Sequence, residues 1–364
     1  MHIESISYKN LRNLKDNKIV FGKGINIFIG DNAQGKTNLL ESIYFCGTGR
    51  SHRTHYYKDL IKFQKDETYI QISTTNDYLK DRIDVYLKKN KKGIAINNIT
   101  IKKLGELFGI LLVVIFSPED LNLIKSGPEK RRRFVDMELC QLKPLYYHGL
   151  GQYYNVLRQR NNLLKKIKVN KNLIDTIFVW DKQLETYGTN IIEYRKDFIK
   201  KINAISHNIH SNITNKKEKL EIIYKPNVNP EEFLNKLQKN IERDVLQGST
   251  SVGIHKDDLL FLIDGVDTKT YGSQGQQRTA SLSTKLAQIE LIFEEKNTYP
   301  ILLLDDVLSE LDENRQKFIL KQIKDIQTII TCTGTEKIID MLENSLDTKI
   351  YHVKEGDFFD AKHV

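Results

Sequence analysis

The first part of the chain changes from the hydrophobic pattern of a strand to that of a helix across a short polar loop. Residues 25–29 read Ile-Asn-Ile-Phe-Ile, a run typical of a buried strand. Leu39, Leu40 and Ile43 then recur at the spacing of one helix face. A glycine-containing loop at residues 30–38 joins the two segments. The pattern therefore predicts a strand, a loop and a helix in direct succession.

Three further strand-like runs follow, and Asn, Asp and Lys-Gly turn residues separate them. They cover residues 69–73, 83–87 and 94–99, and they predict a small antiparallel β patch. Residues 111–116, Leu-Leu-Val-Val-Ile-Phe, are apolar throughout, which is typical of a strand buried on both faces.

From Pro118 to about Val245 the hydrophobic positions keep a helical period, which predicts an inserted helical lobe. One helix of this lobe carries an apolar seam formed by Leu184, Tyr187, Ile191, Tyr194 and Phe198. An extended coiled coil would use the same seam, but Lys201 interrupts its next position. A helix packed within the lobe is therefore expected.

Glycines and strand-like segments return after the lobe. A helix with Leu282 and Ile289 on one face is expected after Gly272. The apolar strand 301–304 follows it, and residues 328–331 form another short strand.

Length and charge narrow the class of protein. A chain of 364 residues is expected to form two structural units, because single cores rarely grow beyond a few hundred residues. Lys and Arg number 56 against 47 Asp and Glu, a net charge of +9. Such an excess attracts nucleic acid, because binding releases the counterions condensed on phosphates. A solvated basic surface would give the same count, so both interpretations stay open.

The cysteines and the hydropathy indicate a cytoplasmic protein without a membrane segment. Cys46, Cys140 and Cys332 lie far apart, an odd number without a CxxC pair, which favours a reducing compartment. The N-terminus lacks the apolar region of a signal peptide. The longest apolar run, 111–116, is far too short to span a bilayer.

The loop after the first strand has the pattern of a phosphate-binding loop. Its residues Gly30, Asp31, Asn32, Ala33, Gln34, Gly35, Lys36 and Thr37 match GxxxxGK[ST] between a strand and a helix. Such a loop points backbone N–H groups and a helix N-terminus at phosphate oxygens. Lys36 is expected to balance charge on the β and γ phosphates, and Thr37 to offer its hydroxyl to Mg²⁺. The motif predicts a nucleotide site.

The apolar strand 301–304 runs into Asp305 and Asp306. Carboxylates at a buried strand end beside a triphosphate suit Mg²⁺ binding. Asp305 is expected to hold the metal through water, and Asp306 is expected to be the catalytic residue that polarises the attacking water. Two acids after an apolar strand can also cap a helix, so the assignment depends on the phosphate loop.

Residues 271–278, Tyr-Gly-Ser-Gln-Gly-Gln-Gln-Arg, precede an amphipathic helix. The glycines permit close approach of the backbone, and Ser273 with the helix N-terminus offers hydrogen-bond donors to a phosphate. A simple turn with a helix cap would use similar residues. Its position between the phosphate loop and the paired aspartates favours the phosphate-binding interpretation.

The order of these segments resembles that of ABC-type ATPases. The phosphate loop is followed by Gly-Ser-Gln-Gly-Gln at 272–276, which looks like the ABC signature, then by the strand with two acids, and then by Ser-Glu-Leu-Asp at 309–312, which looks like the D-loop. The resemblance implies that Ser273, with Gly275 and Gln276, binds the nucleotide held by a second subunit. ATP would then join two chains.

Within that superfamily the chain resembles the RecF family over essentially its whole length. The matching segments are Asn-Leu-Arg-Asn at 10–13, Gly-Asp-Asn-Ala-Gln-Gly-Lys-Thr-Asn at 30–38, Ser-His-Arg-Thr at 51–54, Phe-Ser-Pro-Glu-Asp-Leu at 116–121, Gly-Ile-His-Lys-Asp-Asp at 253–258 and Gly-Ser-Gln-Gly-Gln-Gln-Arg-Thr at 272–279. Ile254 and Lys256 depart from the family's usual Gly-Pro-His-Arg-Asp-Asp.

The resemblance implies an α/β fold: an ABC-type P-loop ATPase head with a small antiparallel β patch and an inserted helical lobe. The head would comprise residues 1–116 and 246–364, and the lobe residues 117–245. ATP and Mg²⁺ would be the cofactors, and Asn38 and Arg12 would join the nucleotide contacts. The histidine that transporter ATPases place after the next strand is absent, so Thr331 or Thr333 would supply any γ-phosphate contact there.

The resemblance further implies ATP-dependent binding to single-stranded, gapped or junction DNA in recombinational repair and replication. It implies an ATP-dependent homodimer whose weak ATPase activity acts as a switch. RecR and RecO, and through them RecA, would be the protein partners, and the SOS response would be supported.

Three alternatives belong to other classes. The ATPase subunit of an ABC transporter would need a membrane partner, the switch histidine and a more standard signature. An SMC-type ATPase would need far longer coiled coils than residues 117–245 allow. A small-molecule P-loop kinase would have no use for the signature-like and D-loop-like segments.

Two basic clusters in the lobe are candidate DNA contacts: Lys130, Arg131, Arg132 and Arg133, and farther on Lys165, Lys166, Lys168 and Lys171. Tyr146, Tyr147, Tyr153 and Tyr154 lie between them and could stack on bases. A solvated charged face and tyrosines packed in the core are the competing interpretations.

Overall fold

The computed structural model describes residues 1–76, 79–334 and 348–361. The chain divides into two compact units, Met1–Asp120 with Gln288–Val364, and Leu121–Ala287. The first unit therefore combines segments from both ends of the chain. Residues 246–287 belong to the second unit, whereas the prediction from the sequence places them in the ATPase head. The functional boundary of that head stays a prediction.

The first unit contains a mostly parallel sheet with the strand order β15-β14-β3-β13-β12-β8. Its strands are β3 (Ile25–Ile29), β8 (Val113–Phe116), β12 (Ile301–Asp305), β13 (Thr328–Cys332), β14 (Thr348–Lys354) and β15 (Asp357–Asp360). Only the β14–β15 pair is antiparallel among the pairs of these strands. The four apolar runs expected as strands are confirmed as β3, β8, β12 and β13, which agrees with the near-continuous hydrophobicity of buried parallel strands.

The same unit contains an antiparallel sheet with the order β2-β1-β4-β5-β6-β7. Its strands are β1 (His2–Lys9), β2 (Asn17–Val20), β4 (Glu67–Asn76), β5 (Leu79–Lys88), β6 (Lys91–Ile96) and β7 (Ile99–Thr100). The predicted patch is confirmed as β4, β5 and β6. The sheet is larger than expected, because β1 and β2 extend it on the side of β4.

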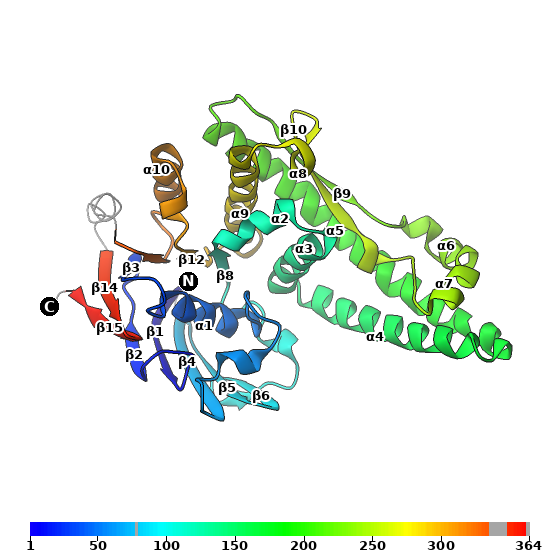
Figure 1. The fold of residues 1–364 in the computed structure, drawn as a ribbon, viewed down its shortest axis with the longest axis horizontal. Helices are drawn as coiled ribbons and strands as arrows, with labels where there is room; N and C mark the ends of the chain where they lie inside the picture. Colours follow the sequence, from blue (N-terminus) through cyan, green and yellow to red (C-terminus); the bar gives the residue numbers. More distant parts are fainter. Residues whose placement is uncertain (77–78, 335–347, 362–364) are drawn as a thin grey trace. The chain divides into compact units, whose positions relative to one another are not determined.

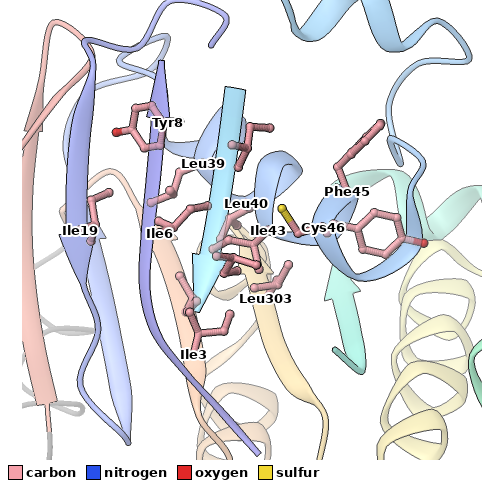
Figure 2. Close-up of a cluster of buried hydrophobic side chains, with 14 of the residues drawn as sticks. Ile3, Ile6, Tyr8, Ile19, Leu39, Leu40, Ile43, Phe45, Cys46 and Leu303 are labelled. Atoms are coloured by element: carbon pink, nitrogen blue, oxygen red, sulfur yellow. The ribbon is translucent and has the colours of Figure 1, made fainter. Parts of the chain in front are cut away.

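Helix α1 (Lys36–Thr48) joins the two sheets through the main hydrophobic core of this unit. Figure 2 shows Leu39, Leu40 and Ile43 of α1 among Ile3 of β1 and Leu303 of β12. These side chains are fully buried. The core fixes the start of α1, and therefore the loop before it, against the strand ends.

The second unit is mainly helical (Figure 1). Its helices are α2 (Asn122–Lys125), α3 (Pro128–Leu142), α4 (Pro144–Ile167), α5 (Ile177–Ile213), α6 (Phe233–Lys239), α7 (Ile241–Gln247) and α8 (Thr268–Tyr271). The expected seam lies on α5, where Leu184, Ile191 and Phe198 are buried. Helix α9 (Gln274–Lys296) begins in this unit and ends in the first, which also holds α10 (Glu313–Gln322).

The expectation of a purely helical segment up to Val245 is wrong for residues 220–225. These residues form β9 (Leu220–Lys225), which pairs antiparallel with β10 (Asp258–Ile263), and β10 pairs with β11 (Val266–Asp267). The run Leu-Glu-Ile-Ile-Tyr-Lys is short and half-buried, and its partner strand comes much later in the chain. Only that non-local pairing makes it a strand.

All three cysteines are buried free thiols. Within the described ranges, every helix is too short or too polar to cross a membrane.

Candidate nucleotide site

A cavity of about 320 Å³ lies in the first unit where β3, β12 and β13 end. It is lined by Asn13, Asn32, Ala33, Gln34, Gly35, Lys36, Thr37, Asn38, Arg53, Asp305, Asp306 and Thr331. The fold therefore brings the loop motif and the paired aspartates together across most of the sequence. The carboxyl ends of strands are the usual ligand position in α/β sheets.

At two positions of the loop, the structure shows a steric reason why the residue is glycine. A Cβ atom on Gly30 would lie 2.3 Å from the carbonyl oxygen of Val353 in β14. Gly35 has φ 106°, which disfavours any side chain, and a Cβ atom there would lie 2.3 Å from Leu14 Cδ2. The loop can hold this shape only with glycine at both positions.

Lys36 is the first residue of α1, and its side chain folds back over the loop. The ammonium group donates hydrogen bonds to the carbonyl oxygens of Gly30 and Asp31, the latter at 2.8 Å. Burial lowers the pKa of Lys36, and nearby carboxylates, Asp306 first among them, oppose that shift. An anionic phosphate in the cavity would restore the charged form.

The two predicted metal ligands lie in direct contact. The Thr37 hydroxyl donates to Asp305 Oδ1 at 2.8 Å, and the Thr331 hydroxyl donates to the same oxygen at 2.9 Å. Burial raises the pKa of Asp305, although both hydroxyl groups act in the opposite direction. A carboxylate this deeply buried gains from a nearby cation, so the pair fits a divalent metal ion.

Asp306 has a left-handed backbone, with φ 54°. Its N–H donates to the carbonyl and hydroxyl oxygens of Thr331, each at 3.2 Å. Its carboxylate accepts a hydrogen bond from the Ser309 hydroxyl at 3.0 Å. Three contacts therefore fix Asp306 at the wall of the cavity. Of the two threonines considered at the next strand, Thr331 lines the cavity.

Arg12 is engaged with Glu41 rather than with the cavity wall. Its guanidinium makes two 2.8 Å hydrogen bonds to the fully buried Glu41 carboxylate. Ser51 donates to the same carboxylate, and Arg53 lies 3.8 Å from it. A nucleotide contact of Arg12 stays a prediction.

Asn13 and Arg53 line the cavity, although neither was predicted as a site residue. Asn13 donates to the carbonyl of Ala33 at 3.0 Å and accepts from Asn38 at 2.7 Å. Arg53 donates to Asn38 Oδ1 at 3.0 Å. Both residues belong to segments that resemble the RecF family, at 10–13 and 51–54, and this resemblance was the signal that could have identified them.

The signature-like residues lie in the second unit, at the start of α9. Ser273 is exposed, its hydroxyl accepts from the N–H of Gln276 at 3.2 Å, and its own N–H donates to Gln276 Oε1 at 2.9 Å. This reciprocal pair has the pattern of a capping box. Gly275 has open space around its Cα, since a Cβ atom added there would lie 3.9 Å from Ser273 Oγ. The nucleotide contacts assigned to these three residues stay predictions.

The fold and the phosphate loop define the class of protein. A family model described as the RecF/RecN/SMC N terminal domain matches residues 2–356. Solved SMC head structures have a similar fold, among them a head domain from Pyrococcus furiosus with a TM-score of 0.56 and 17% identity, which covers 99% of this chain and 96% of that chain. At this identity the likeness concerns the fold alone.

More similar relatives identify the branch of that class. The DNA replication and repair protein RecF of Lachnoclostridium phytofermentans is 51% identical over 358 residues, which cover 98% of this chain and 99% of the relative. RecF of Clostridium tetani is 48% identical over 367 residues, with 98% and 99% covered. A solved structure of the recombination mediator protein RecF with ATP in the RecFOR pathway has a TM-score of 0.92 and 37% identity, with 98% and 97% covered. The chain belongs to the RecF family of DNA replication and repair proteins.

Family membership decides between the interpretations of the sequence. The α/β head architecture and a role in DNA replication and repair are confirmed. The relatives give no support to the ABC-transporter alternative.

Proposed function

We propose that this chain is an ATP-dependent DNA clamp of recombinational repair, in which bound ATP joins two copies and hydrolysis releases them. One observation carries the proposal: the phosphate loop, Thr37, Asp305 and Asp306 line a single cavity. The solved RecF–ATP structure at 37% identity supports ATP as the nucleotide.

The cavity suits ATP with Mg²⁺ on the chemistry of its own residues. Lys36 would bind the β and γ phosphates, because it is a buried cation at the loop. The Thr37 hydroxyl and the Asp305 carboxylate are oxygen ligands of the kind Mg²⁺ prefers, with Asp305 acting through water. Mg²⁺ would supply charge neutralisation between phosphate oxygens. Asp306 would orient the attacking water, and the resulting weak ATPase activity would serve as a switch.

Dimerisation would bring the exposed Ser273 of one chain to the nucleotide of the other. Its position at the start of a long helix supports this role, because helix N-termini favour anions. Gly275 and Gln276 would lie beside it.

The partners proposed for the clamp are single-stranded, gapped or junction DNA and the RecR and RecO proteins, which would lead to RecA loading and support of the SOS response in the cytoplasm. The RecFOR pathway of the solved RecF structures supports this assignment. The net charge of +9 is compatible with a polyanionic partner.

The test is the sedimentation mass of Asp306→Asn protein with and without ATP and Mg²⁺, in the presence of a labelled gapped DNA. Loss of the Asp306 carboxylate blocks hydrolysis and traps the ATP-bound state. We expect a dimer that carries the DNA with it, and only when ATP and Mg²⁺ are both present.

A double variant that adds Lys36→Ala provides the control, because it should lose the nucleotide and remain monomeric. If the Asp306→Asn protein binds ATP but stays a monomer, the clamp is wrong. If it forms an ATP-dependent dimer that does not bind the labelled DNA, the proposed DNA function is wrong, although the nucleotide site is supported.

A further inference from the structure

The structure separates the two basic clusters of the second unit. Arg131 is buried, and its guanidinium makes hydrogen bonds of 2.6 and 3.0 Å to Asp258. Arg132 donates to the carbonyl of Asp257 at 2.7 Å. These two arginines hold α3 against the start of β10. Tyr146 and Tyr153 are fully buried as well, so the core interpretation holds for them.

The second basic cluster has a different environment. Lys165, Lys166, Lys168 and Lys171 are all exposed, at the end of α4 and the start of the following 3₁₀ helix (Lys171–Thr176). We call these four lysines the tip cluster. Among the residues that the structure describes, no carboxylate forms an ion pair with any of them.

Three lysines along α5, in contrast, form ion pairs. Lys182 pairs with Glu185 at 3.1 Å, Lys196 with Glu193 at 3.0 Å and Lys201 with Asp197 at 3.0 Å. Neighbouring carboxylates therefore neutralise the charge of these three lysines locally. The tip cluster keeps its positive charge, although the exposed Asp175 and Glu242 on adjacent elements reduce it in part.

The tip cluster rests on a small core of its own. Leu164, Ile167 and Ile177 are buried together, and Leu173, Ile241 and Val245 pack against them. Figure 1 shows the end of α4 beside α7, and Lys168 Nζ donates to the carbonyl of Leu246 at 3.3 Å. Asn170 caps the 3₁₀ helix through the N–H of Asn172 at 3.1 Å. The lysines are therefore presented from ordered backbone.

We propose that the tip cluster binds the phosphate backbone of DNA. The inference rests on the proposed DNA-binding function and adds a surface to it. Four exposed ammonium groups within seven residues leave a net positive charge beside Asp175 and Glu242, and a phosphate backbone would neutralise it. The exposed amides of Asn162, Asn170 and Asn172 supply further donors to phosphate oxygens.

An acidic protein segment is the competing occupant. Protein interfaces exclude lysine from their centres and use large apolar or aromatic anchors there. Between Lys165 and Lys171 the one large apolar side chain that is exposed is Val169, and Leu246, whose carbonyl accepts from Lys168, is exposed beside the cluster. Four charged side chains therefore outnumber the apolar ones at this surface. The composition therefore favours DNA.

The test compares two variants that lose the same charge. The tip variant carries Lys165→Gln, Lys166→Gln and Lys168→Gln, and the control variant carries Lys182→Gln, Lys196→Gln and Lys201→Gln. Affinity for a labelled gapped DNA is measured with ATP and Mg²⁺ over a series of salt concentrations. Each phosphate contact that is lost should lower the slope of log affinity against log salt by about 0.9 on duplex DNA and about 0.7 on a single strand.

We expect the tip variant to bind DNA about tenfold more weakly or worse, with a shallower salt dependence, and the control variant to resemble the wild type. Both should still sediment as dimers with ATP, which shows that they are folded. Equal losses in both variants, or unchanged DNA binding by a tip variant that no longer binds a purified RecR protein, would overturn the inference. Absence of DNA binding by the wild type would instead overturn the proposed function.

Discussion

At the scale of single residues, the cavity holds a buried ammonium group and a buried carboxylate. The pKa of each is shifted in the direction that favours its neutral form. Burial lowers the pKa of Lys36 and raises that of Asp305. The charged form of each residue is therefore stabilised when a ligand of opposite charge binds beside it. A triphosphate with a divalent cation supplies both charges at once.

Replacing Lys36 with alanine should lower ATP affinity by about ten- to a hundred-fold, since a hydrogen bond to a charged group contributes about 1.5–3 kcal/mol. The variant should also lose the ATP-dependent retention of DNA. Isothermal titration with ATP and Mg²⁺ measures the first effect, and retention of labelled DNA measures the second.

Lys65→Ala is the matched control, because Lys65 is exposed on a loop of the same unit. It should bind ATP as the wild type does. Normal ATP-dependent DNA retention by the Lys36 variant would rule out the assigned role of this lysine.

Gly30→Ala should distort the loop, because the added Cβ would meet the Val353 carbonyl oxygen at 2.3 Å. Such overpacking costs about 1–3 kcal/mol. Gly151→Ala is the contrasting variant, since a Cβ on this α4 residue has open space, and the change should stabilise the helix by about 0.5–1 kcal/mol. Thermal unfolding of the two variants should therefore shift in opposite directions, and a shared direction would contradict the steric argument.

At the scale of elements, several contacts hold residues 253–257, which include a short 3₁₀ helix (Ile254–Lys256), in place before β10. Gly253 has φ 131°, and a Cβ there would lie 2.1 Å from the Tyr153 hydroxyl. His255 bridges that hydroxyl, 2.9 Å from Nδ1, and the carbonyl of Thr250, 3.0 Å from Nε2. A neutral ring that donates from Nε2 and accepts at Nδ1 satisfies both partners.

Burial lowers the pKa of His255 from 6.5 to about 4. Between these values the unfolded chain binds a proton that the folded chain does not, so stability falls as the pH drops through this window. The contribution is at most about 1.4 kcal/mol per pH unit.

Denaturant unfolding from pH 7 to pH 4.5 should show a smaller loss of stability in His255→Gln than in the wild type. Comparison of the two proteins cancels the titration of the carboxylates that they share. Parallel pH profiles would show that His255 does not titrate in this way.

The sequence predicted those elements whose residues are buried on both sides. The strands β3, β8 and β12 consist mainly of apolar residues, β13 adds two buried threonines to its apolar residues, and the ends of β3 and β12 place the loop motif and Asp305. β9 was missed because its pattern is short and its partner is remote. Asn13 and Arg53 reach the cavity through the folding of separate loops onto α1, which hydrophobic periodicity does not predict and which only the family-like segments at 10–13 and 51–54 indicated.

At the scale of the whole molecule, the proposed clamp needs two chains to complete each nucleotide site. Ser273→Arg should leave ATP binding by the monomer unchanged, because Ser273 is not among the described residues that line the cavity. It should abolish ATP-dependent dimerisation, since a bulky cation replaces the small exposed serine.

Titration of ATP and sedimentation with ATP measure the two properties separately. Ser273→Ala is the milder companion variant and should weaken dimerisation without abolishing it. If Ser273→Arg loses ATP binding as a monomer, the serine acts within its own chain.

The position of β3 between β13 and β14 has a consequence for the order of events during synthesis. The strand that carries the phosphate loop is made early, but both of its neighbours in the sheet are made much later. The loop also leans on β14 and the turn after it, through the Val353 carbonyl at Gly30 and the N–H of Glu355, which donates to Gln34. A ribosome-bound chain that stops before β14 therefore lacks the contacts that hold the loop at Gly30 and Gln34, and we expect it to bind ATP only after β14 has been made.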